Sequence, residues 1–231
     1  MRRLIAAAVM GAAVWGGVAQ AGDQPVVVEL FTSQGCASCP PADALLGELA
    51  GREDVIALGL HVDYWDYIGW KDVFGSPAFT KRQKDYAKAA GRRTIYTPQL
   101  IVGGKDHVVG FRPMELAQLI EMHHAVPDRV NLTAVRQGGD VVLRARLVDG
   151  PTVNMVVQLA RFSRKETVEI ENGENAGRTI TYHNVVRDWS TLGAWDGATP
   201  LTLEFAAPDG PLAIIIQEAG YGPVVAAARL D

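Results

Sequence analysis

The sequence predicts an α/β unit with parallel strands in its first half and a β-rich unit in its second half. Apolar runs at residues 26–31 and 55–62 are short and almost continuous, which is typical of strands buried on both faces. A helix-like segment separates them, so these elements form a strand-helix-strand unit with a right-handed crossover. From about residue 130 short alternating strands follow one another, and no comparable helix separates them.

The first 21 residues have the pattern of a signal peptide. A short basic start is followed by an apolar run at residues 4–18 and by the small-x-small cleavage site Ala19-Gln20-Ala21. The apolar run is too short to span a bilayer comfortably, and no later segment is long and apolar enough to do so. We therefore expect cleavage near Ala21 and a periplasmic or secreted protein that has no membrane partner after cleavage.

The charge of the chain disfavours nucleic acid as a partner. The formal net charge is -4 at pH 7, and removal of Arg2 and Arg3 with the signal peptide lowers it to -6. The sequence contains no basic run and no patch in which aromatic and basic residues alternate. We expect no nucleic acid partner and no bound cofactor.

Both cysteines of the chain, Cys36 and Cys39, lie between the first strand and the first helix. A helix is predicted from Cys39 to Ala50, because Pro40 and Pro41 are compatible with a first helical turn, where the missing N–H groups cost little. The free N–H groups and the dipole of a helix N-terminus favour negative charge, so the pKa of the Cys36 thiol should fall. This pattern predicts a redox pair, in which Cys36 is the more exposed attacking thiol and Cys39 is the resolving thiol.

A structural disulfide and half of a metal site are the other interpretations of this CxxC pair. In the chain-entropy model a bridge that closes about four residues contributes about 2 kcal/mol, against about 4.7 kcal/mol for a hundred residues. Zinc sites built on a CxxC usually have a second Cys or His pair, and none of suitable spacing is present. The redox pair is therefore the preferred interpretation, and we predict no metal site.

The segment between the second strand and residue 127 contains a long loop, two helices and a hairpin. Residues 63–72 combine aromatic and acidic side chains without periodicity and are predicted to form a surface loop. A helix follows from Ser76-Pro77, as N-cap and first residue, to Gly91. A hairpin at residues 94–110 is entered through Thr97-Pro98, and a last helix starts after Arg112.

This order of elements, with a CxxC before the first helix and a proline before the later hairpin, resembles the thioredoxin fold. The resemblance implies that Pro98 is cis, and that the loop of Thr97 and Pro98 packs against the dithiol and binds the substrate backbone. More closely, the chain resembles a family of secreted bacterial proteins catalogued as a domain of unknown function. That resemblance covers essentially the whole mature chain and rests on residues 27–36, 39–43, 63–66, 97–99 and 174–178.

Glu29 is a candidate proton acceptor, because it lies on the strand that leads to the dithiol. A buried carboxylate at this place could relay a proton from Cys39, and the other interpretation is a structural hydrogen bond. His61 and Asp63 share one face at the end of the second strand, since side chains alternate along a strand. A satisfied polar pair is the simpler interpretation of these two residues.

The predicted fold class is an α/β thioredoxin-like domain followed by an all-β sandwich-like domain. The signal peptide occupies residues 1–21, and the thioredoxin-like domain with its helical insertion occupies residues 22–127. The β-sandwich domain occupies residues 128–231, where strand-like runs are separated by Gly- and Pro-containing turns.

The predicted function is thiol-disulfide exchange with protein or small-molecule thiols and disulfides. The predicted catalytic residues are Cys36, Cys39 and Glu29, and Thr97 and Pro98 shape the substrate groove. One alternative is a copper(I)-handling protein, since soft thiolates suit Cu(I). Another is a non-catalytic binding or assembly protein whose cysteines form an inert disulfide.

Overall fold

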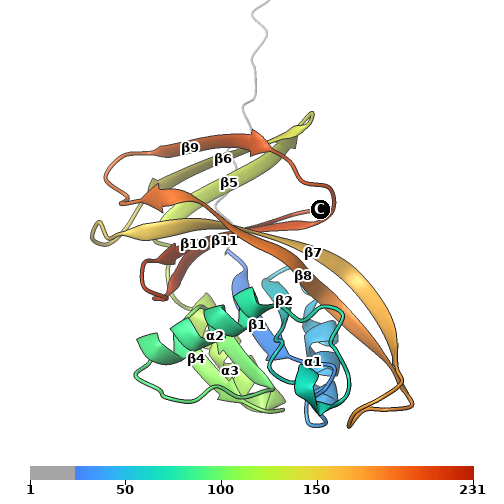
Figure 1. Cartoon of the computed structure of the whole chain (residues 1–231). Helices are drawn as coiled ribbons and strands as arrows, with labels where there is room; N and C mark the ends of the chain where they lie inside the picture. Colours follow the sequence, from blue (N-terminus) through green and yellow to red (C-terminus); the bar gives the residue numbers. More distant parts are fainter. Residues whose placement is uncertain (1–23) are drawn as a thin grey trace, which may run out of the picture.

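The computed structural model describes residues 24–231, and the expected signal peptide lies outside the described residues. The elements, shown in Figure 1, are β1 (Val26–Thr32), α1 (Pro40–Leu49), β2 (Val55–His61), the 3-10 turn η1 (Asp66–Ile68), α2 (Pro77–Ala89), β3 (Gln99–Val102), β4 (Asp106–Val109), α3 (Pro113–His124), β5 (Val130–Gln137), β6 (Asp140–Leu147), β7 (Met155–Ile170), β8 (Arg178–Trp195), β9 (Leu201–Ala206), β10 (Leu212–Glu218) and β11 (Val224–Leu230). None of the helices described here has the length and apolar character needed to cross a membrane.

Strand β1 is central to the part of the sheet that carries the helices. It pairs with β2 in parallel, from Val26 opposite Val55 to Thr32 opposite His61, and with β3 in antiparallel. Side chains alternate along β1, so Val28 and Leu30 pack with α1 and α3 while Val27 and Phe31 pack with α2. The two faces of β1 are therefore covered by different helices, which explains its almost continuous apolar sequence.

The C-terminal strands do not form a self-contained sandwich. All elements after residue 127 are strands, as the alternating pattern predicted. Four of them extend the first sheet, whose strand order is β11-β10-β7-β8-β2-β1-β3-β4. The separate sheet β5-β6-β9 packs on the β7, β10 and β11 part of this long sheet around a third apolar core. Sandwich-like packing is present, but one of its layers is continuous with the α/β sheet.

The long β7–β8 hairpin is the element that joins the two halves of the protein. Its strands contain 16 and 18 residues, and they run from the upper layer of Figure 1 down past α1. Strand β8 pairs with the otherwise open edge of β2 at Gly59 and Val185. Gly47 of α1 allows this approach, because a Cβ there would lie 2.8 Å from the His183 ring. The tip of the hairpin therefore reaches the part of the protein that carries the cysteines.

Candidate dithiol site

Cys36 and Cys39 are joined by a disulfide at the start of α1. Cys39 is the N-cap residue of this helix, and Pro40 and Pro41 occupy its first two positions. The Cys39 amide donates to the Cys36 carbonyl over 3.1 Å, so the two cysteines lie in one tight turn. The predicted meeting of the two sulfurs before the helix is confirmed.

Cys36 is buried, which differs from the expected exposure of an attacking thiol. Its residue is 1 % exposed and Cys39 is 0 % exposed, whereas Ala37 and Ser38 between them are exposed. Two segments from later parts of the chain pack against this turn, namely residues 63–72 and the β7–β8 hairpin tip, residues 171–177. A helix N-terminus by itself leaves a thiol open to solvent, so the burial is a consequence of tertiary packing.

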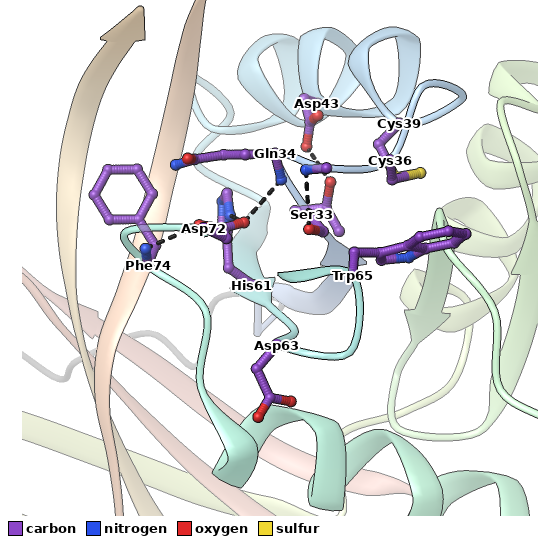
Figure 2. Close-up of polar contacts among 12 residues, drawn as sticks. Ser33, Gln34, Cys36, Cys39, Asp43, His61, Asp63, Trp65, Asp72 and Phe74 are labelled. Atoms are coloured by element: carbon purple, nitrogen blue, oxygen red, sulfur yellow. Dashed lines mark hydrogen bonds and ion pairs between the residues drawn. A yellow bond between two sulfur atoms is a disulfide. The ribbon is translucent and has the colours of Figure 1, made fainter. Parts of the chain in front are cut away.

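Trp65 connects the disulfide turn to the proline loop. Its indole Nε1 donates to Thr97 Oγ1 over 2.7 Å, and a Cβ on Gly35 would lie 3.2 Å from Trp65 Cβ. The Thr97–Pro98 peptide is cis, as the resemblance implied. The residue after Pro98 pairs with Phe31 of β1, so Thr97 and Pro98 lie at the end of the sheet from which the disulfide turn begins. Figure 2 shows Trp65 beside Cys36.

Asp72 fixes the loop of residues 63–72, called the covering loop below, to the chain that precedes Cys36. Its Oδ2 accepts a hydrogen bond from the Gln34 amide over 2.8 Å and lies 2.7 Å from His61 Nδ1 (Figure 2). Its Oδ1 accepts from the Phe74 amide over 2.8 Å. The His61 and Asp72 side chains are almost completely buried. Asp63 does not pair with His61 and instead accepts from Thr80 Oγ1 over 2.5 Å.

Asp43 is the buried carboxyl group on the α1 side of the sheet. Its amide donates to the Cys39 carbonyl over 3.1 Å, and its Oδ1 accepts from Thr32 Oγ1 over 2.8 Å. Its Oδ2 has no hydrogen-bond partner among the described residues. Burial raises the pKa of Asp43 to about 7, with a smaller upward contribution from Asp72, while His61 and Thr32 act in the opposite direction. This carboxyl group, four residues after Cys39, thus gains and loses its proton near neutral pH.

Glu29, the proton acceptor expected from the sequence, lies on the opposite face of β1. Its carboxylate accepts from Arg82 Nε over 2.6 Å, from Arg82 Nη2 over 2.9 Å and from the Tyr86 hydroxyl over 2.6 Å. Both partners belong to α2, whereas the disulfide precedes α1 on the other face. The structure therefore does not bring Glu29 together with Cys39. Glu29 lies three positions before Thr32 on β1, so the two side chains point to opposite faces, and it is Thr32 that faces Asp43.

The hairpin tip contributes two polar side chains that the sequence analysis did not identify. Asn175 Nδ2 donates to the Gln34 carbonyl over 2.9 Å and to the Cys36 carbonyl over 3.0 Å. The Ala37 amide donates to Glu174 Oε2 over 3.3 Å. Asn and Glu are ordinary residues in a hairpin turn, so no local pattern distinguishes these two from solvated turn residues. The resemblance of residues 174–178 to the family was the available signal.

Fold and site together define a mixed α/β protein with a buried CxxC disulfide at the N-terminus of its first helix. Within residues 24–231 no group of three His, Cys, Asp or Glu side chains is placed to hold a metal ion. The chain belongs to the family described as "Protein of unknown function (DUF1223)", which matches residues 27–217. This confirms the expected membership in an uncharacterised family. No curated protein matches the chain.

The solved structures that are similar to this chain include the following two. One is the X-ray crystal structure of a protein from Agrobacterium tumefaciens, with 34% sequence identity and a TM-score of 0.77, over 89% of this chain and 93% of that chain. The other is HBP35 of Porphyromonas gingivalis, with 16% identity and a TM-score of 0.59, over 90% of this chain and 75% of that chain. At this low identity the second similarity concerns the fold alone.

Proposed function

We propose that the protein is a periplasmic or secreted thiol-disulfide oxidoreductase that acts through Cys36 and Cys39. The observation that carries this proposal is a disulfide at a helix N-terminus, linked through Trp65 to the Thr97–Pro98 loop. The Cys36 thiolate of the reduced protein attacks a partner disulfide and forms a mixed disulfide, and Cys39 then attacks the Cys36 sulfur and releases the partner as a dithiol. In sum, the partner disulfide takes up two electrons and two protons while Cys36 and Cys39 become a disulfide, and the same steps in reverse oxidise a partner dithiol.

Residues 22–127 are interpreted as the thioredoxin-like domain that the sequence predicted. This interpretation is supported by the strand order β2-β1-β3-β4, with α1 and α3 on one face and α2 on the other. It is also supported by the position of the CxxC before α1 and of the cis proline before β3. The partners that fit such a site are protein or small-molecule thiols and disulfides.

Trapping of a mixed disulfide tests the proposal directly. In a Cys39→Ala variant, Cys36 is expected to remain covalently attached to its partner, because the thiol that would release it is absent. The exported protein would be quenched with acid, alkylated and analysed for disulfide-linked partners, including glutathione. A Cys36→Ala variant is the matched control. If the Cys39→Ala variant carries no more adducts than this control, the proposed exchange is wrong.

Cys36 is buried, so the packing around the disulfide turn has to open before a partner can reach the sulfur, and Trp65 makes one of the contacts in that packing. Trp65→Phe keeps the ring but removes the donor to Thr97 Oγ1, a hydrogen bond worth about 1 kcal/mol. We expect the disulfide to be reduced by dithiothreitol about five times faster in this variant, measured by quenched alkylation.

Tyr67→Phe is the control for this experiment, because Tyr67 stacks on Trp65 but is 80% exposed. Its reduction rate is expected to equal that of the wild type. Equal rates for all three proteins would show that the Trp65 contact does not limit access to the disulfide.

A non-catalytic protein with an inert disulfide is the second candidate, and the burial of Cys36 and Cys39 favours it. The reduction potential separates the two functions. Structural disulfides of exported proteins have potentials below about -300 mV, and working couples have higher values. A potential below that limit, together with an absence of trapped partners, would select the inert disulfide.

A further inference from the structure

We infer that the tip of the β7–β8 hairpin sets the redox balance of the dithiol, with Asn175 as a positioning residue for Cys36 and Glu174 as a charge that favours the disulfide over the dithiol. This inference deepens the proposed function and rests on it for its biological meaning. The effect concerns the equilibrium between the Cys36–Cys39 disulfide and the dithiol, which is measured on the purified protein without a natural partner.

The tip binds both polar groups of the peptide bond that follows Cys36. The carbonyl of this peptide, on Cys36, accepts from Asn175 Nδ2 over 3.0 Å, and its amide, on Ala37, donates to Glu174 Oε2 over 3.3 Å. The other proton of the Asn175 amide binds the Gln34 carbonyl over 2.9 Å. Two adjacent residues of one hairpin thus hold the disulfide turn, 137 to 141 positions away in the sequence.

Asn175 is itself held in place, so it can act as a rigid clamp. It is 2 % exposed, and its Oδ1 accepts from Arg178 Nη1 over 3.1 Å, which orients the amide. The tip also touches the covering loop, because a Cβ on Gly173 would lie 3.2 Å from Trp70 Cβ. A restrained turn keeps the two sulfurs at bonding distance, which favours the disulfide over two separate thiols.

Glu174 places a negative charge next to the residue whose sulfur becomes a thiolate after reduction. Its Oε2 lies 3.3 Å from the nitrogen of Ala37, the residue that follows Cys36. A negative charge beside the peptide bond that follows Cys36 disfavours a thiolate on that residue, so we expect it to raise the pKa of the Cys36 thiol. In the oxidised protein the Cys36 sulfur is uncharged and the carboxylate keeps its hydrogen bond. The charge therefore acts against the reduced form and leaves the disulfide unaffected.

The experiment compares variants of the mature protein in glutathione buffers. Two glutathione molecules supply two electrons and two protons to the disulfide and become one glutathione disulfide. The ratio of dithiol to disulfide is measured by alkylation and mass shift. The thiol pKa of Cys36 is measured from the pH dependence of its alkylation in the reduced protein.

Glu174→Gln retains an oxygen that can accept from Ala37 but removes the charge. We expect the equilibrium constant to move about tenfold towards the dithiol, equivalent to about 30 mV for this two-electron couple, and the pKa of the Cys36 thiol to fall. Glu171→Gln is the matched control, because it removes the same charge from an exposed residue of the same tip. Equal shifts in both variants, or no shift in Glu174→Gln, would overturn the assignment of Glu174.

Asn175→Ala removes the clamp without a change of charge. We expect several-fold more dithiol at equilibrium with an unchanged pKa of the Cys36 thiol, and partial recovery in Asn175→Gln. A loss of stability with an unchanged equilibrium would identify Asn175 as merely structural. Failure of partner trapping would reject the oxidoreductase function, yet these shifts would still be measurable, so the two failures are distinguishable.

Discussion

Replacement of Arg82 by methionine is expected to lower the free energy of unfolding by about 3–5 kcal/mol, because it leaves the Glu29 carboxylate buried without its cation. The Glu29 side chain is 0% exposed, and two arginine nitrogens donate to it at 2.6 and 2.9 Å. The guanidinium also lies 3.8 Å from the centre of the Trp189 ring. Methionine fills part of this space but supplies no donor. The measurement is urea unfolding at pH 7.

Two further variants show whether the effect comes from the unpaired charge. Lys81→Met breaks an exposed ion pair with Asp85 on the same helix and is expected to cost less than about 1 kcal/mol. The double variant Glu29→Gln/Arg82→Met removes both charges and is expected to recover most of the loss. If Arg82→Met is no more destabilising than Lys81→Met, the buried Arg82–Glu29 pair does not make the expected contribution to the free energy of unfolding.

Asp43→Asn is expected to be more stable than the wild type by an amount that increases between about pH 4 and pH 7. The pKa of Asp43 is about 7 in the folded protein and 3.8 in the reference state. Between these values the folded state holds a proton that the unfolded state has released, so the wild type loses stability as pH rises. Above pH 7 the wild type has lost roughly 4 kcal/mol of its free energy of unfolding through this group. Asparagine does not titrate, so the variant does not lose stability through this position as pH rises.

The groups that face Asp43 come from four parts of the fold. Thr32 of β1 donates to its carboxylate, and His61 of β2, Asp72 of the covering loop and Tyr182 of β8 interact with it electrostatically. Asparagine retains an oxygen for the Thr32 hydrogen bond, so the comparison isolates the charge. Urea unfolding of both proteins from pH 4 to pH 8 gives the difference at each pH.

Asp54→Asn provides a control of opposite sign for the Asp43 prediction. A hydrogen bond from Arg52 lowers the pKa of Asp54 to about 2. The charged Asp54 carboxylate therefore stabilises the folded protein fully above about pH 4, and this stabilisation is lost as pH falls below that value. The difference in the free energy of unfolding between Asp54→Asn and the wild type is expected to be constant between pH 4 and pH 8. A constant difference for Asp43→Asn over the same range would contradict the raised pKa.

Local sequence patterns were sufficient for the elements around the cysteines. The apolar runs identified β1 and β2, and the helix predicted from Cys39 to Ala50 is observed from Pro40 to Leu49, with Cys39 as its N-cap. Ser76 was predicted as the N-cap of α2, and its side chain accepts from the Ala78 amide. These features depend on residues within one or two turns of each other, so they can be recognised without knowledge of the fold.

The continuity of the large sheet could not be recognised in the same way. The alternating patterns after residue 130 predicted strands, but alternation does not specify which strand is the neighbour. The pairing of Gly59 with Val185 joins β2 to β8 across more than a hundred residues. The open edge of β2 and the absence of a Cβ at Gly47 and Gly59, where one would lie 2.8 Å and 3.3 Å from His183, make this pairing possible.

The amino-acid sequence by itself determined that two cysteines meet between a buried strand and a helix, that a proline enters a later hairpin, and that strands follow. Tertiary structure decided the surroundings of those cysteines. It buried Cys36, paired Glu29 with Arg82, buried Asp43 of α1 against Thr32 and brought Asn175 to the disulfide turn. The physical reason is that spacing along the chain determines helices, turns and alternating faces. Contacts between distant residues depend on which strand edges and helix faces are brought together.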